Sequence, residues 1–164
     1  MLPSIIFWNE LVFWNELVFW NELVFWNELA SWNELIITKR MMELILYRTR
    51  IRPDTTDGAL EMDGGLFCHT VERSATRLPG GEYEVRVVRP RTGEPRIRVY
   101  APKGSRPVGE LLHGNGACRL PKGAVIVGER RARGLCIRSR PTFDFLLGLL
   151  EREQEGVRLV VAQE

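Results

Sequence analysis

Cysteine and histidine occur close together at two points of this sequence, and this pair of residues can carry out nucleophilic chemistry. Cys68 directly precedes His69, and Cys118 follows His113 by five residues in a glycine-rich stretch. In a cysteine nucleophile, histidine accepts the proton of the thiol, which requires the two side chains to lie within about 3 Å of each other. The spacing of His113 and Cys118 allows this contact, so these two are the candidate catalytic residues. A hydrogen-bonded loop histidine is the commoner role, and it is the one that we expect for His113.

The same residues match a metal site poorly. A structural zinc site takes two pairs of Cys or His, with about two to five residues between the members of each pair. Cys68 and His69 are adjacent on a predicted strand, where successive side chains point to opposite faces. We therefore predict that the chain holds no metal and no cofactor.

The three cysteines bear on the compartment of the protein and on which residues lie in its core. They lack paired spacing, so we predict no disulfide framework and a reducing compartment, the cytoplasm. Cys136 lies between Leu135 and Ile137, and Cys68 lies on an alternating strand. We predict that both are buried, as free cysteines generally are.

Glycine and proline divide residues 41–164 into short segments with the character of strands. We predict strands at 43–51, 59–62, 66–71, 83–88, 96–100, 124–127 and 157–162. Asp63-Gly64-Gly65 predicts a hairpin turn, because Asp and Gly tolerate positive φ. One helix is predicted, with Ser139 as its cap and Pro141 in its first turn, before a stripe of Phe and Leu. These elements predict an α+β, mainly β fold: a compact antiparallel β domain, barrel- or sandwich-like, with one C-terminal helix.

Residues 1–40 differ from this single predicted domain at 41–164. A Phe-Trp-Asn-Glu-Leu-Val unit recurs through 7–35 and contains all five tryptophans. Its six-residue period gives no apolar face on a helix or a strand, and its Asn-Glu pairs argue against a transmembrane span. No Lys or Arg precedes Lys39, which argues against a secretory signal. We expect a low-complexity leader that is not a folded domain and reflects a tandem DNA repeat ahead of the true start at Met41 or Met42. A membrane-surface or partner-binding helix is the alternative.

The charge of residues 41–164 is modest, with 21 Lys and Arg against 16 Asp and Glu. Tyr83 and Tyr100 could stack on bases beside a basic stripe formed by five arginines, Arg86, Arg89, Arg91, Arg96 and Arg98. Glu82, Glu84 and Glu94 are interleaved with these arginines, as on an ordinary solvated face of a sheet. We therefore expect no nucleic-acid partner. An unidentified ligand or a partner protein stays open.

Several motifs along residues 42–161 occur in an order that is typical of one family. They include a Met-Glu-Leu-like first strand, a Phe-x-Cys-x-Thr strand, a Pro-x-Gly-x-Tyr-x-Val-like segment and a His-x-Gly-Asn-like segment. The residues that carry them are 42–46, 56–60, 65–72, 78–85 and 112–115, together with Ser139-Arg140 before the helix. In these segments the chain resembles domain-of-unknown-function family 5675, a bacterial and phage module. The resemblance implies a phage- or mobile-element-associated protein and no established activity.

One departure from this family bears on chemistry. Where its members usually have Gly-Cys-Ile-x-Val-Gly, this chain has Ala124 in place of the cysteine. A His before a Gly-Cys segment is also distantly similar to the cysteine transpeptidases of bacterial cell walls, and a methyl group cannot replace their thiol. We therefore predict a non-catalytic binding or structural module in which His113, Gly114 and Asn115 frame a shallow site. The alternative is a cell-wall-directed cysteine acyl-transfer enzyme, or its degenerate descendant, that uses His113 with Cys118.

Overall fold

The computed structural model describes residues 41–153 and 156–162. Met41–Glu164 forms one compact unit. The predictions for residues 1–40, that the hexapeptide repeat is a leader and not a folded domain, lie outside the described residues.

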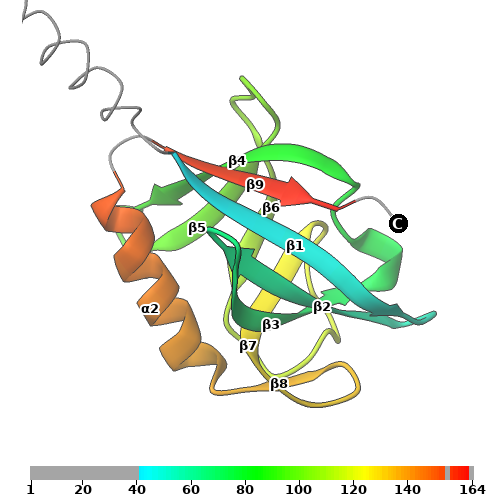
Figure 1. Cartoon of the computed structure of the whole chain (residues 1–164). Helices are drawn as coiled ribbons and strands as arrows, with labels where there is room; N and C mark the ends of the chain where they lie inside the picture. Colours follow the sequence, from blue (N-terminus) through cyan, green and yellow to red (C-terminus); the bar gives the residue numbers. More distant parts are fainter. Residues whose placement is uncertain (1–40, 154–155, 163–164) are drawn as a thin grey trace, which may run out of the picture. The chain divides into compact units, whose positions relative to one another are not determined.

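Strands dominate the described residues (Figure 1). The first five are β1 (Met42–Ile51), β2 (Thr55–Met62), β3 (Gly65–Arg73), β4 (Gly81–Val88) and β5 (Arg96–Tyr100). The remaining elements are β6 (Pro107–Leu112), β7 (Ala124–Ala132), β8 (Leu135–Ile137), the helix α2 (Ser139–Arg152), β9 (Val157–Val161) and the short 3-10 helix η1 (Ser74–Thr76). The prediction of a mainly β domain with one C-terminal helix is confirmed. Within the described residues, no helix has the length and apolar character needed to cross a membrane.

Eight of these strands close into a barrel. Pairing runs in the order β3, β2, β1, β9, β4, β5, β6 and β7, and β7 then pairs with β3. β8 lies outside this ring and pairs with the second half of β7. Closure leaves the strands of the ring without free edges, which is one way in which β proteins avoid edge-to-edge aggregation. It also decides between the barrel and the sandwich that the sequence left open.

Two strand pairs of the barrel are parallel, which the prediction of an antiparallel domain missed. β1 pairs in parallel with β9, and β6 pairs in parallel with β7. A parallel pair needs a connection longer than a hairpin turn. Residues 113–123 supply this connection between β6 and β7, and β1 and β9 come from opposite ends of the unit.

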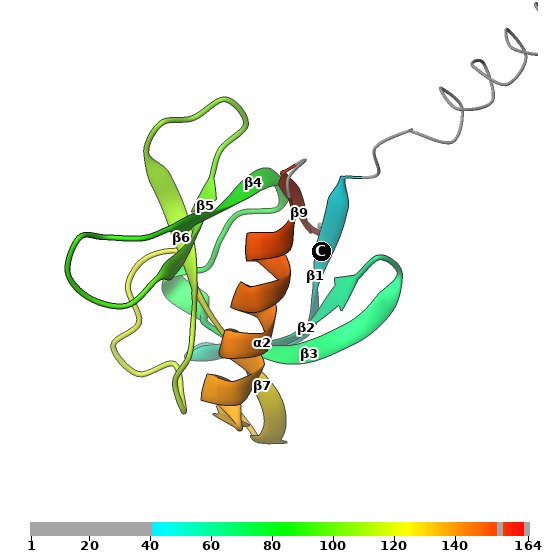
Figure 2. The same cartoon turned by 90° about the vertical axis from the view of Figure 1, so that its left-hand side faces the viewer.

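Apolar side chains fill the barrel, and α2 covers one end of it. Inward residues alternate along each strand, as Leu44 and Leu46 do on β1. Phe143, Leu146 and Leu150 of α2 belong to the same core and form the predicted helical stripe. Figure 2 shows α2 between strands β4, β5 and β6 on one side and strands β1, β2 and β3 on the other. The helix therefore closes the core against solvent.

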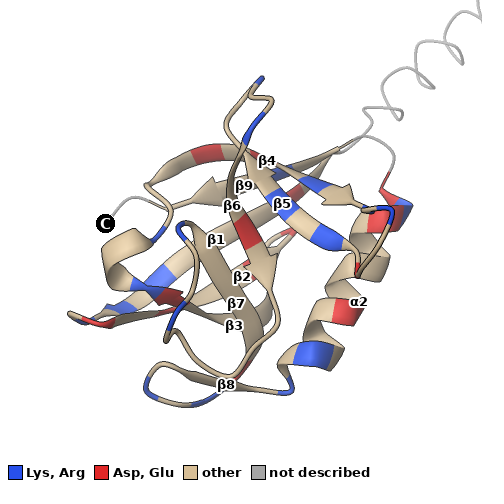
Figure 3. Cartoon of the chain, turned by 180° about the vertical axis from the view of Figure 1, so that it is seen from behind, with Lys and Arg blue, Asp and Glu red and all other residues tan. Residues whose placement is uncertain are grey.

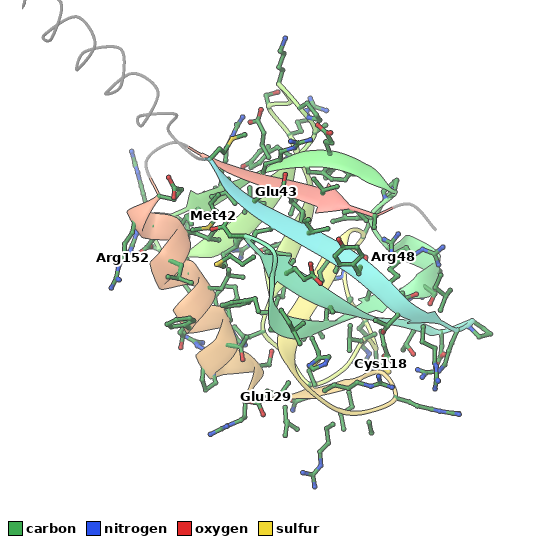
Figure 4. All side chains as sticks on the ribbon, in the orientation of Figure 1. Met42, Glu43, Arg48, Cys118, Glu129 and Arg152 are labelled. Atoms are coloured by element: carbon green, nitrogen blue, oxygen red, sulfur yellow. The ribbon has the colours of Figure 1, made fainter. Side chains whose placement is uncertain are left out.

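A buried ion pair lies at the part of β1 that is farther from α2 (Figure 4). The side chains of Arg48 and Glu72 are 4% and 1% exposed, and Arg48 Nε lies 3.0 Å from Glu72 Oε2. Arg48 also donates a hydrogen bond to the carbonyl oxygen of Leu78, whose N–H donates to Glu72 Oε1 at 3.4 Å. The pair thus ties β1, β3 and the segment before β4 together inside the barrel.

Local turn chemistry explains the β2–β3 hairpin. Asp63 and Gly64 have φ of 49° and 85°, as a two-residue hairpin turn of this kind requires, so the predicted turn is confirmed. β6 was not predicted, because Pro107 and Gly109 are unusual in a strand. Gly109 is needed there, since a Cβ atom would meet the carbonyl oxygen of Gly123 on the neighbouring segment.

Candidate functional site

His113 follows the last residue of β6 and lies against the first turns of α2. Its ring meets the ring of Phe143 edge-on, with the ring centroids 5.4 Å apart. His113 Nε2 lies 3.3 Å from Arg140 Nη1 and 3.6 Å from Glu94 Oε2. The His113 side chain is 38% exposed. Three elements that are distant in sequence, the β4–β5 loop, the end of β6 and α2, therefore meet at this residue.

Arg140 is the centre of the charged groups around His113. Its Nε lies 3.0 Å from Asp144 Oδ1, and its Nη1 lies 3.0 Å from both carboxylate oxygens of Glu94. Hydrogen bonding from Arg140 lowers the pKa of Glu94, and the two carboxylates raise the pKa of Arg140. We refer to Glu94, His113, Arg140 and Asp144 as the His113 cluster. The described ranges hold no group of three or more His, Cys, Asp or Glu side chains placed to bind a metal ion.

The residues after His113 are anchored on two sides. The Gly114 N–H donates to Ser139 Oγ at 2.9 Å, and the Ser139 hydroxyl donates to the carbonyl oxygen of Val127 at 2.5 Å. A backbone N–H of β8 donates to the carbonyl oxygen of Asn115 at 3.0 Å. The prediction that Ser139 caps α2 is wrong, because its hydroxyl forms this bridge and the residue before the helix is Arg138, with φ 51°. The three predicted binding residues thus form one fixed segment.

Cys118 belongs to the same connection between β6 and β7 but is not hydrogen-bonded to His113. It is exposed, and Figure 4 places it well away from α2. Within the described part of the chain, the polar partners of the His113 ring are Glu94 and Arg140. The structure therefore does not give His113 and Cys118 the contact that a nucleophile and its base require.

Ala124, at the position where the family usually has cysteine, faces away from His113. Val125 and Val127 of β7 point into the barrel core, so the alternation of the strand turns Ala124 outward. The parallel register places Glu110 opposite Ala124, and His113 lies about 10 Å further along the strand direction. A cysteine at this position would therefore not meet the His113 ring without a change in backbone.

The other two cysteines are buried, as predicted. Cys68 belongs to the barrel core, and Cys136 packs with Val71 and Ile126 in a second cluster. Burial raises the pKa of Cys68 to about 12 and that of Cys136 to about 11. Because the thiolate is the reactive form, both side chains are inert at neutral pH.

Carboxylates balance most of the predicted arginine stripe. Three of its arginines are in ion pairs: Arg86 with Glu84, Arg89 with Glu151 and Arg96 with Glu110. Tyr100 is buried, and Arg86 Cζ lies over its ring, 4.6 Å from the ring centroid. The Tyr83 hydroxyl donates to the carbonyl oxygen of Pro79. These contacts favour the interpretation of the stripe as a solvated face, and the expectation of no nucleic-acid partner stays a prediction.

The sequence carried a signal for one contact of the site and none for another. Arg140 and Asp144 are four residues apart, a spacing that predicts an ion pair on a helix. Glu94 lies 46 positions before Arg140, so only the folded chain brings them together. Asp57 likewise meets a residue far away in the sequence, since its Oδ1 accepts the N–H of Gly134 at 3.0 Å and ties the β7–β8 hairpin to β2.

Comparisons with known proteins identify no relative. No family model matches the chain, and neither a curated protein nor a solved structure matches it. The resemblance to domain-of-unknown-function family 5675 stays a prediction. The function of the chain must therefore be inferred from the fold and the site themselves.

Proposed function

We propose that this chain is a non-catalytic binding or structural module associated with phages or mobile elements. Its recognition surface is the His113 cluster with the adjoining Gly114 and Asn115. The observation that carries this proposal is the way in which the His113 ring is held, with Phe143 against it and with Arg140 and Glu94 beside Nε2.

These contacts support binding over catalysis. A general base must have its nitrogen directed at the group that loses the proton. Here Nε2 is within hydrogen-bonding distance of Arg140, which has no proton-accepting lone pair and is itself fixed by two carboxylates. The arrangement supports a histidine that orients neighbouring groups and contributes to a polar surface.

The contacts within the cluster support a role in recognition. Its groups come from α2, the end of β6 and the β4–β5 loop and are joined by ion pairs, and the exposed side chain of Asn115 adds an amide beside them. Polar groups that are already ordered lose little conformational entropy when a ligand binds. A ligand with complementary hydrogen-bonding groups would therefore meet a preformed surface.

A selection of displayed peptides against the full chain tests this recognition surface. Peptides that bind should lose affinity when Arg140→Gln dissolves the cluster and keep it in Arg131→Gln, which removes an exposed arginine from the β7–β8 hairpin. Binders that respond equally to both variants, or to neither, would contradict the assignment of the surface.

One observation favours the alternative of a cysteine acyl-transfer enzyme: Cys118 carries an exposed thiol. Turnover of an activated peptide thioester distinguishes the two functions. We expect no turnover above the rate given by a free thiol, and the same rate in wild type and His113→Asn. Turnover that is lost in both His113→Asn and Cys118→Ser would overturn the non-catalytic proposal.

A further inference from the structure

The outer face of β5 carries positive charge. Arg96 and Arg98 alternate with the buried Ile97 and Val99, so both arginines point away from the core. Figure 3 shows Lys and Arg over β5 and the loops that adjoin it. Arg86 of β4 lies directly opposite Arg98 in the antiparallel register. Like charges placed opposite each other on neighbouring strands destabilise a sheet.

Arg98 lies between a like and an opposite charge, because Glu110 of β6 is opposite it in the register on the other side. Arg86 is paired with Glu84, with 2.5 Å between the charged atoms, and Arg96 is 4.0 Å from Glu110. Within the described residues, Arg98 has no ion pair and no side-chain hydrogen bond. Its side chain is half-buried, so solvent compensates its charge only in part.

Arg98 lines a surface hollow of about 420 Å³ together with Lys122. Lys122 likewise has no ion pair among the described residues. Glu110 also lines the hollow, with the apolar side chains of Pro107, Val108 and Pro121. The volume is within the range of small-molecule sites, which is about 300 to 1,000 Å³. The hollow thus combines one carboxylate and apolar walls with two cations that form no ion pair among the described residues.

The backbone fixes Lys122 beside this hollow. Gly123 follows Lys122 and packs so closely on β6 that a Cβ atom there would overlap the carbonyl oxygen of Val108. The Glu110 N–H donates to the carbonyl oxygen of Gly123 at 3.2 Å, and the Gly123 N–H donates to that of Thr76 at 2.7 Å. The segment that carries Lys122 is therefore anchored on two sides.

We propose that this hollow binds a small phosphate monoester whose organic part is apolar. The guanidinium of Arg98 and the ammonium of Lys122 would donate charge-assisted hydrogen bonds to the phosphate oxygens. The prolines and Val108 would contact the organic part. Glu110 opposes the ligand charge and is only partly neutralised by Arg96, so it limits the affinity. This site does not involve the His113 cluster, and each proposal can fail without the other.

Calorimetric titration of the full chain with phenyl phosphate and with inorganic phosphate, at low ionic strength, tests the proposal. We expect phenyl phosphate to bind more tightly than inorganic phosphate. Arg98→Gln and Lys122→Gln should each weaken phenyl phosphate about tenfold or more, as the loss of a charge-assisted hydrogen bond does. Glu110→Gln should strengthen binding, since it removes a negative charge. Arg131→Gln, an exposed charge on the β7–β8 hairpin, is the matched control and should change nothing.

Circular dichroism shows whether each variant is folded, and the exposed Lys122 supplies a test if Arg98→Gln unfolds the barrel. The proposal is overturned if neither probe binds, or if the Lys122 variant weakens binding no more than Arg131→Gln does. Equal affinity for inorganic and phenyl phosphate would contradict the proposal that the ligand has an apolar organic part. Weaker binding in Glu110→Gln would overturn the arrangement of charges.

Discussion

Replacing Arg48 with methionine removes the guanidinium from a carboxylate that the barrel buries almost completely. Glu72 is 1% exposed, and in wild type it receives Arg48 Nε at 3.0 Å and Arg48 Nη2 at 3.2 Å. In Arg48→Met its remaining hydrogen bond within the described residues is the N–H of Leu78, at 3.4 Å. The substitution therefore leaves a buried charge without its counter-ion.

Breaking one side of a buried ion pair costs about 3 to 5 kcal/mol, out of a total stability of about 5 to 15 kcal/mol for a domain. With a urea m-value of about 2 kcal/mol/M, the unfolding midpoint of Arg48→Met should fall by about 1.5 to 2.5 M. Far-UV circular dichroism of the full chain follows this transition. Tryptophan fluorescence does not report on the barrel directly, because all five tryptophans lie in residues 1–40.

The double variant Arg48→Met with Glu72→Leu is the matched control. It replaces both charges with apolar side chains of similar size, and such replacements are often neutral or stabilising. We expect it to be more stable than Arg48→Met, although the N–H and the carbonyl oxygen of the buried Leu78 lose these partners in it. A loss of less than about 1 kcal/mol in the single variant, or a double variant as unstable as the single one, would contradict this role of the ion pair.

Two further predictions concern the site and a turn. Hydrogen bonding from Arg140 lowers the pKa of Glu94, so this contact is complete above the ordinary carboxyl pKa and is lost as the pH falls through the lowered value. An NMR titration of the Glu94 carboxyl should therefore give a midpoint that rises in Arg140→Gln, and an unchanged midpoint would contradict the pairing. Gly134 has φ +60°, and a Cβ atom there would lie 2.9 Å from Thr55 Cγ2. Gly134→Ala should therefore lower the free energy of unfolding by about 1 to 3 kcal/mol. Gly148→Ala is its control, because a Cβ atom there meets no other atom, and it should raise the free energy of unfolding by about 0.5 to 1 kcal/mol. Chemical denaturation of both variants should give changes in the free energy of unfolding of opposite sign.

Features of the fold that depend on neighbouring residues were predictable. β5 follows a strict alternation over 96–100, and the hairpin at Asp63-Gly64 follows from the φ angles that these residues tolerate. The apolar stripe of α2 likewise repeats at helical spacing. A further signal was present and missed, since Arg48 has the inward alternation of Leu44 and Leu46. A charge on an apolar face predicts a buried partner.

Features that depend on distant contacts were not predictable from one sequence. The sequence pattern of a strand does not show which other strand it pairs with. The pairing of β3 with β7 and the two parallel pairs were therefore not predicted. Glu94 reaches Arg140 only through the packing of the β4–β5 loop on α2. The sequence also placed Cys118 close enough to His113 to suggest a catalytic pair, because five residues of loop leave the direction of each side chain undetermined.

The rate at which iodoacetamide alkylates Cys118, measured across pH 6 to 9 in wild type and in His113→Asn, tests most directly whether His113 acts with a thiol. We expect Cys118 alone to react in the folded chain, because burial raises the pKa of Cys68 to about 12 and that of Cys136 to about 11. We also expect the same rate and the same pH profile in both proteins. A Cys118 that reacts rapidly below pH 7 in wild type, and slows in His113→Asn, would show that His113 activates the thiol and would overturn the non-catalytic proposal.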